Sequence, residues 1–149
     1  MDRTTSQASL EAKRARRLEA ARQIKDSQER FSQCVEVARR APSLPVELRT
    51  DHHAIPGCLA KLWFVAEFRD ELCWYRCDSD SRVVKGLGTL LCEFFSGEQA
   101  DAIVAFSGDP LGDAGIDRQL SPNRRHGLGQ LRGRIVAFAQ DQIQSNSPL

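Results

Sequence analysis

The chain has 149 residues, enough for one domain with a core of its own, because a domain of this size buries roughly 70% of the surface that its unfolded chain exposes. Its 21 Lys and Arg against 20 Asp and Glu leave a net charge of +1, which argues against a dedicated nucleic-acid binder, since no overall field gathers phosphates. Hydrophobic residues make up 41% of the chain, but no apolar run approaches the roughly 20 residues that cross a bilayer, which argues against a membrane protein.

The N-terminal segment is polar and basic. Residues 1–17 lack the apolar stretch of a secretory signal, which predicts a cytoplasmic protein. Residues 11–24 are rich in Ala, Arg, Glu and Leu but have a thin apolar stripe, which predicts an exposed helix. We therefore assign residues 1–25 to a basic, helical N-terminal extension. The five cysteines, an odd number without a secretory signal, indicate reduced thiols rather than a disulfide framework.

A second helix is predicted to follow this extension. Residues 26–29 (DSQE) have the spacing of a capping box, in which Asp26 accepts backbone N–H bonds and Glu29 reaches back. The apolar residues after it recur at i, i+3, i+4 and i+7, so Cys34 belongs to the inner face of the helix. Two prolines, at positions 42 and 45, end the helix and begin a connection over residues 41–56.

Residues 55–63 (IPGCLAKLW) contain the candidate reactive group. Pro56 fixes its own φ, and Gly57 tolerates backbone angles that other residues avoid, so the chain can turn sharply and present Cys58 on a loop tip. Residues 61–68 are aromatic and β-branched and predict a strand. A second apolar run at 72–77, after a turn at 69–71, completes a hairpin whose two faces are both largely apolar.

The second half of the chain is predicted to be mainly helical. Residues 82–95 have apolar positions at helical spacing, with N-cap candidates at 78–81 before them and Gly97 after them. Residues 98–106 begin as a helix and become β-prone, so we expect a third strand at 103–106. A loop with a short helical turn follows at 108–115. Ser121 as N-cap and Pro122 at the first helical position then begin a last helix that runs to about residue 142.

These elements predict an α+β fold, with a small antiparallel sheet of about three strands and helices packed mainly on one side. The domain is expected to span residues 26–142 and to leave a flexible tail at 143–149.

Seven short segments resemble the SufE family of sulfur-acceptor proteins, in which a Gly-Cys turn precedes a strand beginning with Val-Trp or Leu-Trp. The resemblance runs from about residue 24 to residue 140. Its segments, in order, are 26–30 (DSQER), 44–45 (LP), 56–58 (PGC), 62–63 (LW), 78–80 (DSD), 84–87 (VKGL) and 120–124 (LSPNR).

The resemblance implies that Cys58 takes persulfide sulfur from a pyridoxal-phosphate cysteine desulfurase, stimulates that enzyme, and passes the sulfur to an iron–sulfur cluster scaffold. No metal or cofactor of its own is expected. Arg124 matches a family arginine that helps to dock the desulfurase, although it can equally be an ordinary first-turn arginine. Gly57 and Lys61, on either side of the thiol, are expected to contact the partner as well. A homodimer is left open. One departure is that Leu59 and Ala60 replace polar residues of the family, which removes two hydrogen-bonding side chains near the thiol.

Three other interpretations use the same residues. A structural zinc site would draw on Cys58, Cys73, Cys77 and a histidine of the pair at 52–53. However, Cys73 and Cys77 lie roughly 13 Å apart along a strand, too far to share one ion. A Cys-His hydrolase would use Cys58 with His52, His53 or His126 as base. In a plain protein-interaction module, the Pro-Gly-Cys segment would be only a turn.

Overall fold

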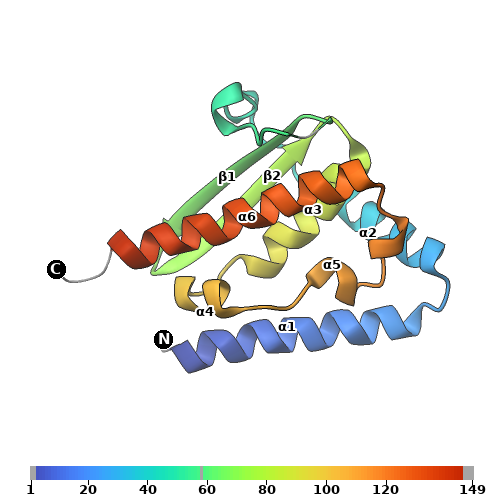
Figure 1. Ribbon diagram of the computed structural model, residues 1–149, viewed down its shortest axis with the longest axis horizontal. Helices are drawn as coiled ribbons and strands as arrows, with labels where there is room; N and C mark the ends of the chain where they lie inside the picture. Colours follow the sequence, from blue (N-terminus) through green and yellow to red (C-terminus); the bar gives the residue numbers. More distant parts are fainter. Residues whose placement is uncertain (1–2, 58, 146–149) are drawn as a thin grey trace.

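A computed structural model describes residues 3–57 and 59–145 of the chain, shown in Figure 1. The elements in chain order are α1 (Arg3–Gln23), α2 (Ser27–Arg39), the short 3-10 helices η1 (Val46–Leu48) and η2 (Asp51–His53), β1 (Leu62–Arg69), β2 (Leu72–Ser79), α3 (Arg82–Phe95), α4 (Ala100–Ala105), α5 (Pro110–Asp113), the 3-10 helix η3 (Asp117–Gln119) and α6 (Pro122–Ser145). None of the described helices is both long and apolar enough to cross a membrane.

The sheet is the predicted hairpin. β1 and β2 pair in antiparallel register from Leu62 opposite Ser79 to Arg69 opposite Leu72. The two residues between the strands, Asp70 and Glu71, both have positive φ, at 55° and 67°. A two-residue turn with positive φ at both positions matches the twist of the strands that it joins, so it holds the hairpin in register.

The predicted third strand at 103–106 is wrong. Residues 100–105 form the helix α4, and Ile103 is fully buried on its inner face. The chain meets the edge of β2 earlier, where the N–H of Cys73 donates to the carbonyl of Glu98 at 3.0 Å and the N–H of Gly97 donates to the carbonyl of Cys73 at 2.8 Å. This single bridge occupies the edge position, and the apolar residues after it are buried by a helix instead.

The core lies between one face of the hairpin and the helices α3 and α6 (Figure 1). The buried residues of β2 on that face are Cys73, Tyr75 and Cys77, and the Tyr75 hydroxyl donates to the carbonyl of Ile135 in α6 at 2.9 Å. α3 approaches β2 closely, because a β-carbon at Gly88 would lie 2.8 Å from Sγ of Cys77. The predicted α+β class, with helices mainly on one side of a small antiparallel sheet, is confirmed, with two strands.

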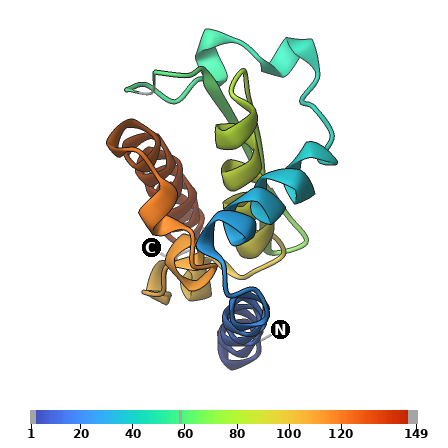
Figure 2. The same ribbon diagram turned by 90° about the vertical axis from the view of Figure 1, so that its right-hand side faces the viewer.

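Helix α1 is confirmed as a helix, but the prediction that it is exposed is wrong for its inner face. Leu10 is fully buried, and Nζ of Lys13 lies 3.1 Å from Oε1 of Glu98, which is 1% exposed. Nζ of Lys13 also donates to the carbonyls of Phe94 and Ser96. Figures 1 and 2 both show α1 at the opposite end of the molecule from the connection that leads into β1. The division of the chain at residue 25 stays a prediction.

Three predicted helix caps occur in the structure. The Asp26 carboxylate accepts the N–H of Gln28 at the start of α2, at 3.2 Å. The Ser81 hydroxyl accepts the N–H of Val84 in α3, and the Ser121 hydroxyl accepts the N–H of Arg124 in α6, both at 3.3 Å. These side chains pair backbone donors that have no acceptor within their own helix.

Candidate functional site

Pro56 and Gly57 lie in a short loop with a fixed base. The N–H of Ile55 donates to the carbonyl of Leu62 at 2.8 Å, and Ala54 forms a bridge with Trp63. Residues 56–61 are therefore held between two paired positions at the start of β1. Pro56 and Gly57 are exposed, whereas Ile55 is buried. Cys58 itself lies outside the described residues, so the predictions made for its side chain remain predictions.

The other end of this loop is fastened to the segment between β2 and α3. The N–H of Lys61 donates to Oδ1 of Asp80 at 3.0 Å, and the Ser79 hydroxyl donates to the carbonyl of Lys61 at 2.6 Å. The ammonium group of Lys61 is exposed and has no partner among the described residues. The role of Ser79 and Asp80 in holding this loop was not predicted, because residues 78–81 were interpreted as N-cap candidates and 78–80 as a segment of the family resemblance.

The residues on both sides of Cys58 lie against the first turns of α6. A β-carbon at Gly57, whose φ is +85°, would lie 3.3 Å from Nε2 of His126. Leu59 and Ala60 border a pocket of about 390 Å³ between the starts of α3 and α6. Its other lining residues are Ser81, Val84, Ser121, Asn123, Arg124 and Gly127.

Arg124 is therefore next to the predicted reactive loop. It lines the same pocket as Leu59, and its guanidinium group has no partner among the described residues. Leu59 is 83% exposed. Gly57, Lys61 and Arg124, which the sequence analysis named as partner-contacting residues, all lie around one loop. Contact with a partner remains a prediction.

Several cationic groups lie at this end of the molecule, together with the carboxylate of Asp80. The helices α3 and α6 both begin at the pocket, and a helix N-terminus carries a partial positive charge. Arg82 and Arg124 lie in the first turns of these helices, and Lys61 lies on the loop beside them. A negatively charged thiolate or persulfide is stabilised in such surroundings.

The other four cysteines are poor candidates for a reactive thiol. Cys73, Cys77 and Cys92 are buried. A hydrogen bond with Cys77, followed by burial, raises the pKa of Cys92 well above its ordinary value, and burial raises the pKa of Cys73. Thiols with raised pKa values stay protonated at neutral pH and react slowly.

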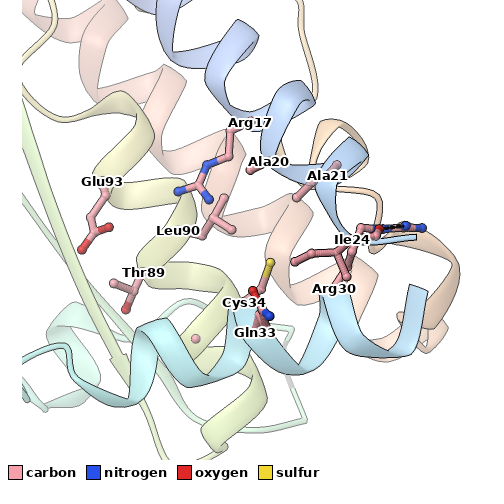
Figure 3. A pocket seen from close by; sticks show the side chains of 12 residues that line it. Arg17, Ala20, Ala21, Ile24, Arg30, Gln33, Cys34, Thr89, Leu90 and Glu93 are labelled. Atoms are coloured by element: carbon pink, nitrogen blue, oxygen red, sulfur yellow. Dashed lines mark hydrogen bonds between the residues drawn. The ribbon is translucent and has the colours of Figure 1, made fainter. Parts of the chain in front are cut away.

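Cys34 is half-buried and packs against the core, close to its predicted place on an inner helix face. Figure 3 shows its sulfur pointing from α2 into a pocket of about 210 Å³ between α1, α2 and α3. Burial raises the pKa of the Cys34 thiol, although the nearby Arg17 acts in the opposite direction. Cys34 is therefore a matched control for Cys58.

The histidines divide into two groups. His52 and His53 stack edge to face in η2 with ring centroids 5.0 Å apart, and Nδ1 of His53 lies 3.3 Å from Oγ1 of Thr50. His126 instead lies against Gly57. Among residues 3–57 and 59–145, no group of three His, Cys, Asp or Glu side chains is placed to hold a metal ion. The described part of the chain thus offers no support for the zinc interpretation.

Comparisons with known proteins identify a family and several relatives of the chain. The sequence profile described as "SufE: Fe-S metabolism associated domain" matches residues 15–139. An uncharacterized SufE-like protein of Rhizobium meliloti is 27% identical over 121 residues, which cover 78% of this chain and 86% of that protein. The sulfur acceptor protein CsdE of Escherichia coli is 32% identical over 114 residues, which cover 74% and 76%. The chain is also similar to the solution structure of a hypothetical protein from Thermus thermophilus, with a TM-score of 0.71 and 19% identity. The match covers 89% of this chain and 96% of that chain, and it shows a similar fold.

Proposed function

This chain belongs to the SufE family, and from that premise we propose that Cys58 accepts persulfide sulfur from a cysteine desulfurase and relays it for iron–sulfur cluster assembly. The family description and the likeness to the sulfur acceptor CsdE support a sulfur-acceptor role in iron–sulfur metabolism. A cytoplasmic location goes with this proposal and is likewise a prediction.

The observation that carries the proposal is the loop around Cys58. Its base is held by hydrogen bonds from Ile55 and Lys61, its flanking residues Pro56, Gly57 and Leu59 are exposed, and Lys61 and Arg124 lie beside it. A transfer residue must enter the active site of another protein, and an exposed loop on a rigid base suits that task. The thiols in the described part of the chain are instead buried or half-buried.

The chemistry is a thiol–persulfide exchange. The Cys58 thiolate attacks the terminal sulfur of the persulfide on the desulfurase, a new S–S bond forms at Cys58, and the S–S bond of the donor breaks. The donor cysteine leaves as a thiolate and takes up a proton, so no net oxidation or reduction occurs. Cys58 carries the persulfide until a thiol of the scaffold attacks its terminal sulfur in the same way. Removal of sulfur from the desulfurase frees that enzyme for the next turnover, which is the origin of the proposed stimulation.

The experiment compares the stimulation of a cysteine desulfurase by three forms of the protein. With cysteine as substrate, the wild type and Cys34→Ser should raise the rate of alanine formation, whereas Cys58→Ser should not. The two variants remove the same atom from thiols in different places. Equal stimulation by Cys58→Ser and the wild type would contradict the proposal.

A further inference from the structure

A pocket of about 210 Å³ lies between α1, α2 and α3, and its lining residues do not include the loop that carries the proposed acceptor. Its floor consists of the buried residues Gly86, Leu90 and Ala114. Gln33 and Glu93 are exposed at its rim, so a small molecule can enter from solvent. An engineered apolar cavity of about 150 Å³ in another protein binds benzene, so this pocket has room for an apolar group of that size.

The inner face of α1 forms one wall of the pocket and leaves the space open. Near the start of the helix this face carries Leu10, which is fully buried. Further along the same helix, Ala20, Ala21 and Ile24 line the pocket. An alanine side chain ends at its β-carbon, so the two alanines do not fill the gap to Leu90 on α3. The wall is therefore apolar and leaves room for a ligand.

The guanidinium group of Arg17 lies beside this apolar wall without a counterion. One turn earlier on α1, Nζ of Lys13 lies 3.1 Å from Oε1 of Glu98. The next residue of the helix is also paired, because Nε of Arg14 lies 3.1 Å from Oδ2 of Asp113. Figure 3 shows Arg17 extending from α1 toward α3 along the pocket. In the part of the chain that the structure describes, no carboxylate lies at ion-pair distance from its guanidinium group.

The other polar groups of the pocket do not neutralise Arg17. Burial raises the pKa of the Cys34 thiol, so this sulfur stays uncharged near pH 7, although Arg17 acts in the opposite direction. The guanidinium group of Arg30 donates to backbone carbonyls, among them that of Gly115. Glu93 is exposed at the rim and does not pair with Arg17. Its negative charge nearby permits a monoanion in the pocket but disfavours a dianion such as phosphate.

We propose that this pocket binds a small monocarboxylate whose apolar body is about the size of a benzene ring. The carboxylate accepts two parallel N–H bonds from the planar guanidinium group of Arg17, because the two groups match in geometry. The apolar body lies against Leu90 and the alanines of α1, which removes it from water. Such a ligand contacts both α1 and α3. Its binding involves neither Cys58 nor sulfur transfer, so the inference goes beyond the proposed function.

The test is an NMR titration of the isotope-labelled protein with sodium benzoate, which has the proposed charge and size. Saturable shifts are expected at the backbone amides of residues 20–24 and 86–90, which border the pocket. Benzyl alcohol has the ring without the carboxylate, and acetate has the carboxylate without the ring. Each should therefore bind at least about tenfold more weakly than benzoate.

Arg17→Gln should weaken the binding of benzoate about tenfold, because it removes the charged donor of the carboxylate. Arg16→Gln is the matched control, since Arg16 carries the same charge on the same helix, is exposed and does not line this pocket. Its affinity for benzoate should equal that of the wild type. A second readout is the alkylation of Cys34 by iodoacetamide, which saturating benzoate should slow because the Cys34 sulfur points into the pocket.

Equal affinities of Arg17→Gln and Arg16→Gln for benzoate would overturn the inference. So would benzyl alcohol binding as tightly as benzoate, the absence of shifts at residues 20–24 and 86–90, or an unchanged rate of Cys34 alkylation. None of these measurements uses a desulfurase, so their result is independent of the test of sulfur transfer.

Discussion

Oδ2 of Asp78 accepts the backbone N–H of Leu44 at 3.0 Å, and both residues are buried. Oδ1 of the same carboxylate accepts the N–H of Ser79 at 2.8 Å and lies 3.5 Å from Nζ of Lys85. The carboxylate thereby joins the connection after α2 to the end of β2 and to α3. Because that connection leads into the Cys58 loop, Asp78 helps to hold the segment that precedes the site.

Asp78→Ala is therefore expected to destabilise the protein by about 3 kcal/mol, since it leaves buried N–H groups without an acceptor and Lys85 without its counterion. Urea denaturation followed by circular dichroism measures this loss. Asp80→Ala is the control, because Asp80 is exposed and accepts one backbone bond, from Lys61. It should cost less than half as much. Equal costs would show that the buried carboxylate has no special structural role.

Gly57→Ala should also destabilise the protein, by about 1–2 kcal/mol, because φ of +85° is unfavourable for alanine and the new methyl group meets His126. Gly129→Ala is the matched change in a helix. A β-carbon at Gly129 has nothing within 4 Å, so alanine should stabilise α6 by roughly 0.5–1 kcal/mol. Thermal unfolding of both variants gives the comparison. A stabilising Gly57→Ala would mean that the turn is not held in its positive-φ form.

Lys13→Ala tests whether α1 is part of the core. The variant leaves Glu98, which is 1% exposed, without the ammonium group 3.1 Å away. Lys13 itself is partly exposed, so we expect a loss of about 2 kcal/mol rather than the larger loss of a fully buried pair. The exposed pair of Arg22 and Glu19 is the control, and Arg22→Ala should change the free energy of unfolding too little to measure. Equal effects would place α1 outside the cooperative core.

Stability should fall at alkaline pH. Burial raises the pKa values of Cys34, Cys73 and Tyr75, and a hydrogen bond with Cys77 together with burial raises that of Cys92. Above about pH 8.5, where an ordinary thiol loses its proton, the unfolded chain releases protons that the folded chain retains. The contribution of these groups to the free energy of unfolding is therefore complete below that pH and is lost as the pH rises further.

Urea titrations at pH 8, 9 and 10 measure this decline. Cys34→Ser removes one of the groups with a raised pKa, so its stability should depend less steeply on pH than that of the wild type. A free energy of unfolding that is constant from pH 8 to 10 would contradict the assignment of these groups as buried and protonated.

The sequence was sufficient for the elements whose periodicity is long or whose turn chemistry is distinctive. The apolar spacing of residues 82–95 predicted α3, and Ser121 with Pro122 predicted the start of α6. The strand predicted at residues 103–106 was wrong because a short apolar run fits a buried strand and a buried helix equally well. What decided between them was the bridge at Glu98, which occupies the edge of β2 and is invisible in local sequence.

Some features around Cys58 could likewise be predicted from local sequence, and others could not. The backbone preferences of Pro56 and Gly57 predict the turn. The contact of Gly57 with His126 joins residues far apart in the chain, as does the hydrogen bond from Lys61 to Asp80, and neither leaves a local pattern. His126 was weighed only as a possible hydrolase base, and its place beside the turn emerges from the packing of α6.

The mass of Cys58 after sulfur transfer tests the central proposal most directly. The protein is incubated with a cysteine desulfurase and cysteine, alkylated without reductant, and digested for mass spectrometry. We expect one extra sulfur atom on the peptide that contains Cys58, its loss on treatment with dithiothreitol, and the same result in Cys34→Ser. Extra sulfur on another cysteine, or none on Cys58 in a folded protein beside an active desulfurase, would contradict the account.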